Sequence, residues 1–203
     1  MYLVKTPSFI QKSFPNFLWR QATEEKTLYL TFDDGPIPEV TPWVLDQLDQ
    51  YQAKATFFCV GDNVEKHPHI FAELTQRGHR VGNHTQQHLS GWATETSKYM
   101  ANVEQCAAKV DSDLFRPPYG RLRPKQAKLL RQKYTVVMWD VLSGDFDVNL
   151  SGKQCWENVR TNVQAGSVIV FHDSLKAKDR LYEVLPKTLD YFAKQAYTFS
   201  TIP

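Results

Sequence analysis

Short runs of consecutive apolar residues alternate with longer segments in which apolar residues recur every three or four positions. The short runs predict buried strands, and the longer segments predict helices with one apolar face. Alternating strands and helices indicate an α/β fold with parallel strands inside and helices outside, the sheet being open or closed into a barrel. The predicted strands are residues 27–32, 55–60, 80–81, 114–115, 134–139, 167–171 and 197–202, and the predicted helices are residues 41–48, 63–77, 97–110, 124–133, 153–163 and 180–195.

Residues typical of element ends set some of these boundaries. Thr41 and Pro42 have the pattern of an N-cap residue followed by proline at the first helical position. Gly78 has the pattern of a C-terminal stop for the helix at 63–77. The apolar run at 134–139 predicts one continuous buried strand.

Polar side chains gather just after the predicted strands. In parallel α/β folds the carboxyl ends of the strands lie on one side of the sheet, where active sites form. We therefore expect these side chains to converge on one site. They are Asp33 and Asp34 after the first strand, His84 after the third, residues 116–120 after the fourth, Asp140 and Asp145 after the fifth, and His172 after the sixth.

Asp33 and Asp34 are adjacent carboxylates before a Gly-Pro turn, and either form a solvated turn or lie against a positive charge. His84 and His88 lie four residues apart, which predicts that both imidazoles face one side of a helical turn. A histidine pair of this spacing is also common on protein surfaces. Two histidines and one carboxylate form the ligand set of a hydrolytic zinc site with one position left for water. A dication there would supply the charge, with one aspartate binding it and the other acting on the water.

The remaining histidines divide into one candidate for catalysis and three for structure. His172 ends the most apolar strand and either caps that strand or serves as a general acid, because its intrinsic pKa suits proton transfer near neutrality. His67, His69 and His79 are interpreted as structural or solvated residues.

Composition limits the other classes of function. The 203 residues fit one domain, and 42% hydrophobic residues are enough for a buried core. A net charge of +2 without a noticeable basic run gives no support for nucleic-acid binding. The three cysteines have no CxxC spacing and are interpreted as small buried hydrophobes. No apolar stretch is long enough for a transmembrane segment.

Residues 1–26 are interpreted as a closing segment that packs on a single domain at 27–203. Two lysines and two prolines interrupt its apolar residues, which argues against a signal peptide. The alternative for this segment is an interfacial membrane anchor. A cytoplasmic location is expected, with export left open if a signal has been removed.

Five motifs in order along residues 27–203 resemble those of the NodB-homology polysaccharide deacetylases, which form carbohydrate esterase family four. Any one of them would be weak evidence, whereas five in order are strong evidence. The resemblance implies a distorted (β/α)7 barrel of the NodB-homology type and metal-dependent hydrolysis of acetyl groups on sugars. The motifs are TFDDG at 31–35, HTQQH at 84–88, RPPYG at 116–120, WDVLSGDF at 139–146 and VFH at 170–172.

The family pattern places a divalent metal on Asp34, His84 and His88. Zinc is the usual ion of the family, and Co²⁺ and Ni²⁺ are alternatives. Asp33 would be the general base that, with the metal, activates the water for attack on the acetyl carbonyl. Arg116 would orient Asp33.

The resemblance also implies roles for the later motifs. The backbone N–H of Tyr119 would stabilise the oxyanion that forms on the carbonyl. His172 would protonate the departing amine or alkoxide. An acid of the fourth motif would tune His172, and alignment by length favours Asp145 over Asp140.

The chain departs from the family pattern at three motifs. Gln86 and Gln87 lie where an aromatic residue is common, Phe146 replaces a tryptophan, and Val170 replaces a leucine. Phe146 and Val170 would still line an apolar slot for the acetyl methyl group. Trp92 is either a sugar-stacking surface or a core residue.

We therefore predict a deacetylase of N- or O-acetylated carbohydrate, with an N-acetylglucosamine-containing glycan favoured. Oligomers of N-acetylglucosamine, peptidoglycan-derived sugars and acetylated xylan are all candidate substrates. The alternatives are a hydrolase of the same fold that acts on a non-sugar amide, and a catalytically silent sugar-binding module. The presence of the base, the acid, the arginine and all three metal ligands argues against the silent module.

Overall fold

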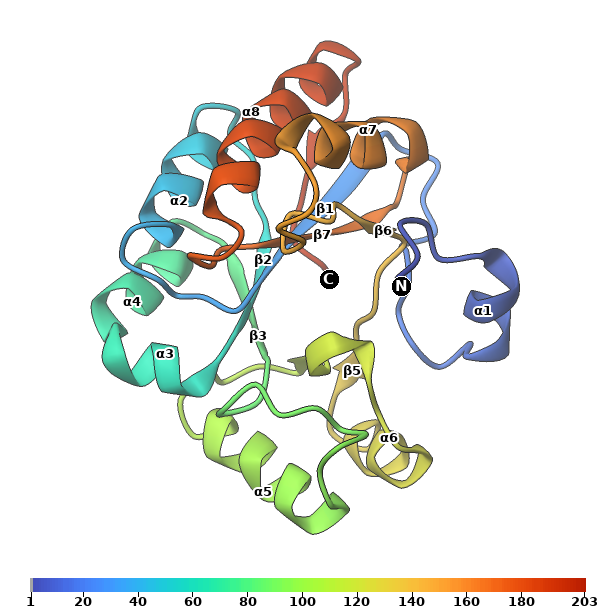
Figure 1. Ribbon diagram of the computed structural model, residues 1–203, viewed down its shortest axis with the longest axis vertical. Helices are drawn as coiled ribbons and strands as arrows, with labels where there is room; N and C mark the ends of the chain where they lie inside the picture. The colour runs from blue at the N-terminus through green and yellow to red at the C-terminus, as the bar shows by residue number, and fades with distance from the viewer. Residues whose placement is uncertain (1) are drawn as a thin grey trace.

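A curved, parallel sheet forms the centre of the computed structural model, which describes residues 2–203, and helices surround it (Figure 1). The strands follow the order β5-β4-β3-β2-β1-β7-β6, and β8 pairs with the start of β1. This is the predicted α/β class with a distorted barrel. The strands are β1 Thr27–Asp33, β2 Thr56–Cys59, β3 Arg80–Asn83, β4 Leu114–Phe115, β5 Thr135–Val136, β6 Val141–Leu142, β7 Val168–His172 and β8 Thr198–Phe199.

Eight α-helices and one short 3₁₀ turn are described in residues 2–203. They are α1 Ser8–Ser13, α2 Thr41–Asp49, α3 Gly61–Lys66, α4 Pro68–Gln76, α5 Thr96–Ala107, η1 Pro118–Gly120, α6 Pro124–Leu130, α7 Gly152–Asn162 and α8 Lys178–Lys194. No helix in this described part combines the length and the apolar character needed to cross a bilayer.

The sheet is open between β5 and β6, and the N-terminal segment fills the opening (Figure 1). The Leu18 N–H donates to the carbonyl of Val136 at 2.9 Å, beside β5, and the Leu142 N–H of β6 donates to the carbonyl of Val4 at 2.8 Å. Residues 4–18 therefore bridge the two edges of the sheet. Met1 of the predicted closing segment lies outside the described residues, and the division of the chain at residue 26 stays a prediction.

Strand β1 lies between β2 and β7 and is buried along its whole length. Leu28, Leu30 and Phe32 pack in the larger core cluster, together with residues of α2, α7 and α8. Tyr29, which alternates with them, belongs to a second cluster made largely of residues from β2, β4 and β7. A strand buried on both faces reads as a continuous apolar run, which is why residues 27–32 were recognisable.

The apolar run at 134–139 is not one strand. Only Thr135–Val136 forms β5, and Val137 continues as extended chain that pairs with Leu18 of the N-terminal segment. The chain then bends, and β6, which the sequence pattern missed, pairs with β7. The apolar run predicts burial, but it does not identify which segment pairs with the backbone N–H and C=O groups of these residues.

Two helix predictions also need correction. The segment 63–77 is divided at His67, which has φ −131° and ψ 55° and precedes Pro68. A residue before proline is disfavoured in the α conformation, so the first helix ends there. Thr41 is the first residue of α2 rather than its N-cap, which is Val40.

Candidate active site

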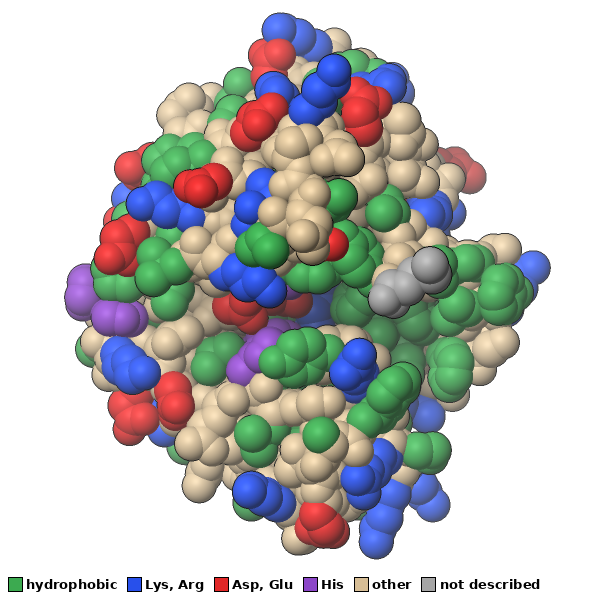
Figure 2. Space-filling model, viewed as in Figure 1, with side chains coloured by type: hydrophobic (Ala, Val, Ile, Leu, Met, Phe, Trp, Pro, Cys, Tyr) green, Lys and Arg blue, Asp and Glu red, His purple; other side chains and the backbone are tan. Residues whose placement is uncertain are grey.

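The carboxyl ends of β1, β3, β4 and β7 meet at a hollow in which acidic and histidine side chains gather (Figure 2). The register of the sheet helps to assemble this site, because Asp33 at the end of β1 pairs with His172 at the end of β7. Asn83 at the end of β3 pairs with Phe115 at the end of β4, which places His84 beside Arg116. The sheet therefore brings the polar residues after these strands to one site.

Asp34, His84 and His88 form a candidate metal centre. Their potential ligand atoms all lie within 4.8 Å of one another. The Asp34 Oδ1 is 3.3 Å from the Nε2 of His88 and 3.9 Å from the Nε2 of His84. His84 and His88 are not on a helical turn, as their spacing had suggested, because Thr85 and His88 have φ values of 65° and 53°. A loop with left-handed residues turns both rings toward Asp34 instead.

His84 is oriented for metal binding by its other ring nitrogen. The Nδ1 of His84 lies 2.7 Å from the carbonyl oxygen of Arg116, which can only accept a hydrogen bond. The ring proton therefore belongs on Nδ1, and the lone pair of Nε2 faces Asp34. Burial lowers the pKa of His84 to about 4, which keeps the imidazole neutral. These donors fit a divalent metal of the zinc type.

Amide side chains fasten the metal-binding loops to the surrounding helices. The Nδ2 of Asn63 donates to the Asp34 carbonyl at 2.8 Å. The backbone N–H groups of Gln86 and Gln87 donate to the carbonyl and the side-chain oxygen of Asn102 in α5, both at 3.1 Å. The two glutamines that depart from the family pattern therefore lie in a loop anchored to α5.

Asp33 is held by a fully buried arginine. The Nη1 of Arg116 donates to the Asp33 Oδ1 and to the Oγ1 of Thr31, both at 2.7 Å. Its Nη2 donates to the carbonyl of Met138 at 2.9 Å. Burial raises the pKa of Asp33, but the positive charge of Arg116 outweighs this, and the pKa lies below its usual value. Asp33 is therefore ionised near neutral pH.

His172 is paired with Asp145. The Nδ1 of His172 lies 2.8 Å from Asp145 Oδ1, and the His172 backbone N–H donates to Asp145 Oδ2 at 2.8 Å. Burial lowers the pKa of His172, but the carboxylate of Asp145 raises it overall to about 9. Asp140 lies elsewhere, where it accepts hydrogen bonds from Lys5 and Ser167, both at 2.6 Å. The geometry thus selects Asp145 over Asp140 as the partner of His172.

Asp173 supports the Asp33–Asp34 turn and was missed by the sequence reasoning. Its Oδ1 accepts a hydrogen bond from the Gly35 N–H at 3.0 Å, and its Oδ2 accepts one from the Thr41 hydroxyl at 2.6 Å. Burial raises the pKa of Asp173 to about 8. The sequence feature that could have identified Asp173 is its position directly after His172, at the end of an apolar strand.

Gly35→Ala is expected to destabilise the protein by about 1–3 kcal/mol, as overpacking of a buried site does. A Cβ atom added at Gly35 would overlap the Asp173 carboxylate, which two hydrogen bonds hold in place. Thermal denaturation measures the effect. The control is the same substitution in an Asp173→Ala background, which lacks the carboxylate that the added Cβ would overlap, so the further loss of stability should be smaller there. An equal loss of stability in the two backgrounds would show that the Asp173 contact is not rigid.

The four residues predicted to bind substrate lie in different surroundings. Tyr119 is 60% exposed, and its ring packs against the ring of His88 with 4.7 Å between centroids. The Phe146 ring lies 5.2 Å from the His172 ring. Trp92 is 60% exposed, so the core alternative for it is wrong. Val170 is only 1% exposed, so it lies beneath the surface and does not line an open slot.

Tyr2 is a further neighbour of the site that sequence reasoning did not identify. Its ring lies 4.9 Å from the Phe146 ring, and its hydroxyl donates to Asp147 at 3.0 Å. Phe146 in turn contacts His172. The N-terminal segment therefore helps to form the wall behind the Asp145–His172 pair.

Comparison with known proteins gives one consistent group. A family model described as polysaccharide deacetylase matches residues 20–137. A peptidoglycan-N-acetylglucosamine deacetylase of Bacillus cereus is 32% identical over 193 residues, which cover 91% of this chain and 90% of that protein. The peptidoglycan-N-acetylmuramic acid deacetylase PdaC of Bacillus subtilis is 30% identical over 187 residues, which cover 88% of this chain but only 38% of that longer protein.

Solved structures show the same architecture. A peptidoglycan N-acetylglucosamine deacetylase, crystallised with a substituted benzamide, superposes with a TM-score of 0.89 at 30% identity, covering 98% of this chain and 95% of that one. A family 4 carbohydrate esterase from Streptomyces lividans, crystallised with acetate, has a TM-score of 0.78 at 26% identity, covering 90% of this chain and 95% of that one. Both similarities extend over nearly the whole barrel.

Proposed function

The chain belongs to the polysaccharide deacetylase family, carbohydrate esterase family four, and we propose that it removes acetyl groups from a glycan containing N-acetylglucosamine. The relatives support this choice of substrate, since several are named as deacetylases of peptidoglycan sugars. Their names also support an amide rather than an ester as the bond that is cleaved.

One observation carries the proposal: two charged pairs and a candidate metal centre lie on the same rim of the sheet. Arg116 holds Asp33 at 2.7 Å, and Asp145 holds His172 at 2.8 Å. Asp34, His84 and His88 form the candidate metal centre, and their potential ligand atoms lie within 4.8 Å of one another. A base, an acid and a metal centre together meet the needs of amide hydrolysis.

We assign the metal to Asp34, His84 and His88, with zinc as the proposed ion because two histidines and one carboxylate are typical of hydrolytic zinc sites. When bound, the metal would polarise the acetyl carbonyl and lower the pKa of water. The chain's own part is to hold the His84 imidazole neutral and to keep Asp34 in place through the hydrogen bond from Asn63 to its carbonyl.

Asp33, Tyr119 and His172 then act on the substrate in turn. Asp33 accepts a proton from the water whose oxygen adds to the acetyl carbon. The backbone N–H of Tyr119 donates to the oxyanion that develops on the carbonyl oxygen. The proton on the Nε2 of His172 passes to the departing nitrogen as the C–N bond breaks, which leaves acetate and a free amine. Asp145 holds the other ring nitrogen, so Nε2 is the atom free to face the substrate.

Asp145→Asn is expected to move the alkaline limb of the pH–rate profile to lower pH by about one unit or more. The Asp145 carboxylate raises the pKa of His172, so its neutralisation lowers that pKa, and the acid loses its proton at a lower pH. Acetate release across a pH series measures the limb. Asp140→Asn removes a buried charge that does not touch His172 and should leave the limb in place. An unshifted limb in the Asp145 variant would contradict the role of Asp145.

Acetate release tests the function itself. The metal-loaded protein is incubated with chitooligosaccharides, N-acetylglucosamine, a peptidoglycan-derived disaccharide, acetylated xylan and a simple non-sugar acetamide, each with and without a chelator. We expect chelator-sensitive release from the N-acetylated substrates. Release from acetylated xylan alone would make the activity an esterase. Sugar binding without acetate release would favour a silent sugar-binding module. Acetate release from the non-sugar acetamide alone would favour a hydrolase of the same fold that acts on non-sugar amides.

We keep the cytoplasmic location as a proposal. Its support is the early lysine and proline residues, which interrupt the apolar stretch of a signal peptide. Fractionation of cells that express the protein with its native upstream sequence would test the location.

A further inference from the structure

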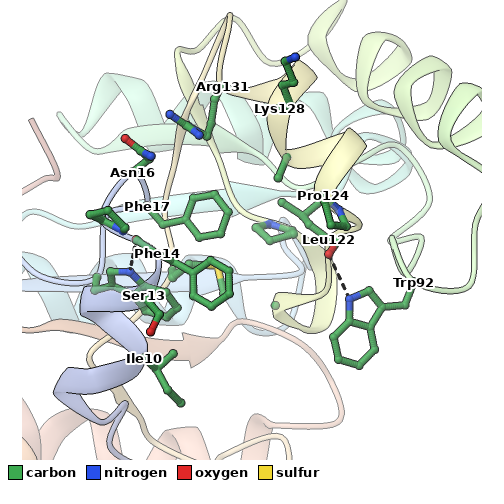
Figure 3. Close-up of a pocket in the computed structure, with 16 residues that line it drawn as sticks. Ile10, Ser13, Phe14, Asn16, Phe17, Trp92, Leu122, Pro124, Lys128 and Arg131 are labelled. Atoms are coloured by element: carbon green, nitrogen blue, oxygen red, sulfur yellow. Dashed lines mark hydrogen bonds between the residues drawn. The ribbon is translucent and has the colours of Figure 1, made fainter.

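An apolar groove of about 610 Å³ runs between the N-terminal segment and the chain around α6. Figure 3 shows Phe14 and Phe17 on one side of the groove and Leu122 and Pro124 on the other. Trp92 lies beyond Leu122, to whose carbonyl its indole N–H donates at 3.1 Å. The groove therefore has aromatic side chains along its length.

Large apolar side chains protrude on this side of the molecule. Phe9 is 67% exposed, Phe14 is 53% exposed, and Trp92 is 60% exposed. Single exposed apolar residues are normal on protein surfaces, but aromatic residues gathered around a groove mark an interaction site. The space-filling view shows apolar side chains gathered over α1 on the right of the molecule (Figure 2).

The charge around the groove has one sign. Residues 2–23 and 114–139 contain ten lysine and arginine residues and no aspartate or glutamate. Three of the ten are paired with carboxylates outside these segments: Arg116 with Asp33, Lys5 with Asp140 and Lys133 with Glu104. The two segments meet only in the fold, so neither the order of the residues nor the net charge of +2 reveals this concentration of cations. Lys128 and Arg131 line the groove and are exposed, and no ion pair joins either to a carboxylate of residues 2–203.

We propose that this surface, the basic-aromatic face formed by Phe9, Phe14, Trp92, Lys128 and Arg131, binds the negatively charged surface of a lipid bilayer. Exposed aromatic residues beside lysine and arginine are the pattern of proteins that lie in a membrane interface. The cations attract anionic lipids, and the aromatic side chains enter the region between headgroups and acyl chains. The proposal goes beyond deacetylation and extends the membrane-anchor alternative for residues 1–26.

A sugar polymer fits the basic-aromatic face less well. Sugar hydroxyls need hydrogen-bond acceptors as well as stacking surfaces, and carboxylates are the strongest acceptors among side chains. The two segments that form most of the groove contain no carboxylate. Their charge matches an anionic lipid surface.

Binding at this face would hold the candidate active site near the bilayer. Pro117 and Gly120 line the groove, and Tyr119 between them packs against His88 of the metal centre. The loop at 116–120 therefore has the groove on one side and the site on the other. A glycan held close to a membrane surface would be within reach of the site.

Cosedimentation of the full chain with vesicles tests the proposal. We expect binding to vesicles of phosphatidylcholine with phosphatidylglycerol, weak binding to phosphatidylcholine alone, and loss of binding at high salt. The double variant Lys128→Glu/Arg131→Glu should weaken partitioning by about thirtyfold or more, and Lys66→Glu/Lys153→Glu, which reverses two exposed lysines on α3 and α7, should not. Phe9→Ser/Phe14→Ser should weaken partitioning as well, since both rings are more than half exposed and outside the core.

Two measurements distinguish a failure of the membrane-binding proposal from a failure of the proposed deacetylase function. Asp33→Asn should bind vesicles like the unmodified chain, and acetate release from a soluble oligosaccharide should be equal in the Lys128→Glu/Arg131→Glu variant. Equal vesicle binding by the groove variant and the control variant would overturn the proposal. Binding to a soluble anionic polysaccharide, with no binding to vesicles, would also overturn it and would assign the face to a glycan.

Discussion

Asp33→Asn is expected to retain the bound metal and to lose turnover by about a hundredfold or more, the scale of removing a general base. The amide has nearly the shape of the carboxylate, and its oxygen can still accept the Arg116 hydrogen bond that now measures 2.7 Å. It cannot take a proton from water near neutral pH. Steady-state acetate release gives the turnover, and elemental analysis gives the metal content.

Asp140→Asn is the matched control for the Asp33 variant. Asp140 is also a buried aspartate, and its cationic partner Lys5 lies at 2.6 Å, so both substitutions remove a buried negative charge that is paired with a cation. A loss of stability can therefore occur in both variants, whereas a large loss of turnover is expected only for Asp33. Near-normal acetate release from the Asp33 variant would assign the general base to another group.

Replacement of Asp34 or His88 by asparagine is expected to weaken metal binding by more than about a hundredfold, because even outer-shell partners change metal affinity by 10–100-fold. Asparagine is chosen since Asp34 and His88 have φ values of 85° and 53°, and asparagine tolerates this left-handed region better than alanine. Competition with a fluorescent chelator measures the affinity without reference to turnover. Acetate release should fall together with metal content.

His69→Asn serves as the control for the metal variants. His69 lies in α4, is exposed, and does not belong to the candidate metal group. Its substitution should change neither the chelator competition nor the stabilisation of the fold by added metal. Unchanged metal affinity in both the Asp34 and the His88 variant would exclude the assigned ligand set.

Much of the site was predictable because its chemistry follows from strand ends. The strand at 27–32 ends at Asp33, and the strand at 167–171 leads to His172, so two apolar runs were enough to predict that these side chains meet. The choice between Asp140 and Asp145 came from the alignment of a motif, and the structure supports it through the contact of Asp145 with His172.

The errors arose where a local pattern is compatible with two conformations. The spacing of His84 and His88 suits a helical turn, but the left-handed residues of the loop depend on anchoring by Asn83 and Asn102, which lie outside that spacing. The run at 134–139 reads as one strand, because an extended segment paired with distant residue Leu18 has the same apolar character. Long-range partners of this kind leave no periodic signal.

Surface features were harder to predict than the site. The cations of residues 121–133 are visible in the sequence, but their importance depends on the acid-free residues 2–23 beside them, and only the fold reveals that proximity. Asp173 was overlooked for a similar reason. Its carboxylate acts on Gly35 and Thr41, which are more than a hundred residues away along the chain.

The closure of the sheet by residues 4–18 has a consequence for the protein during its synthesis. These residues hydrogen-bond to Val136 and Leu142, and Thr31 of β1 bonds to Ile169, 138 residues later. At typical ribosomal rates these partners are synthesised on the order of ten seconds later, and until then the N-terminal aromatic residues and one edge of β1 are unpaired. An uncovered edge of this kind invites association with other chains. We therefore expect the nascent chain to depend on chaperones until β7 has emerged.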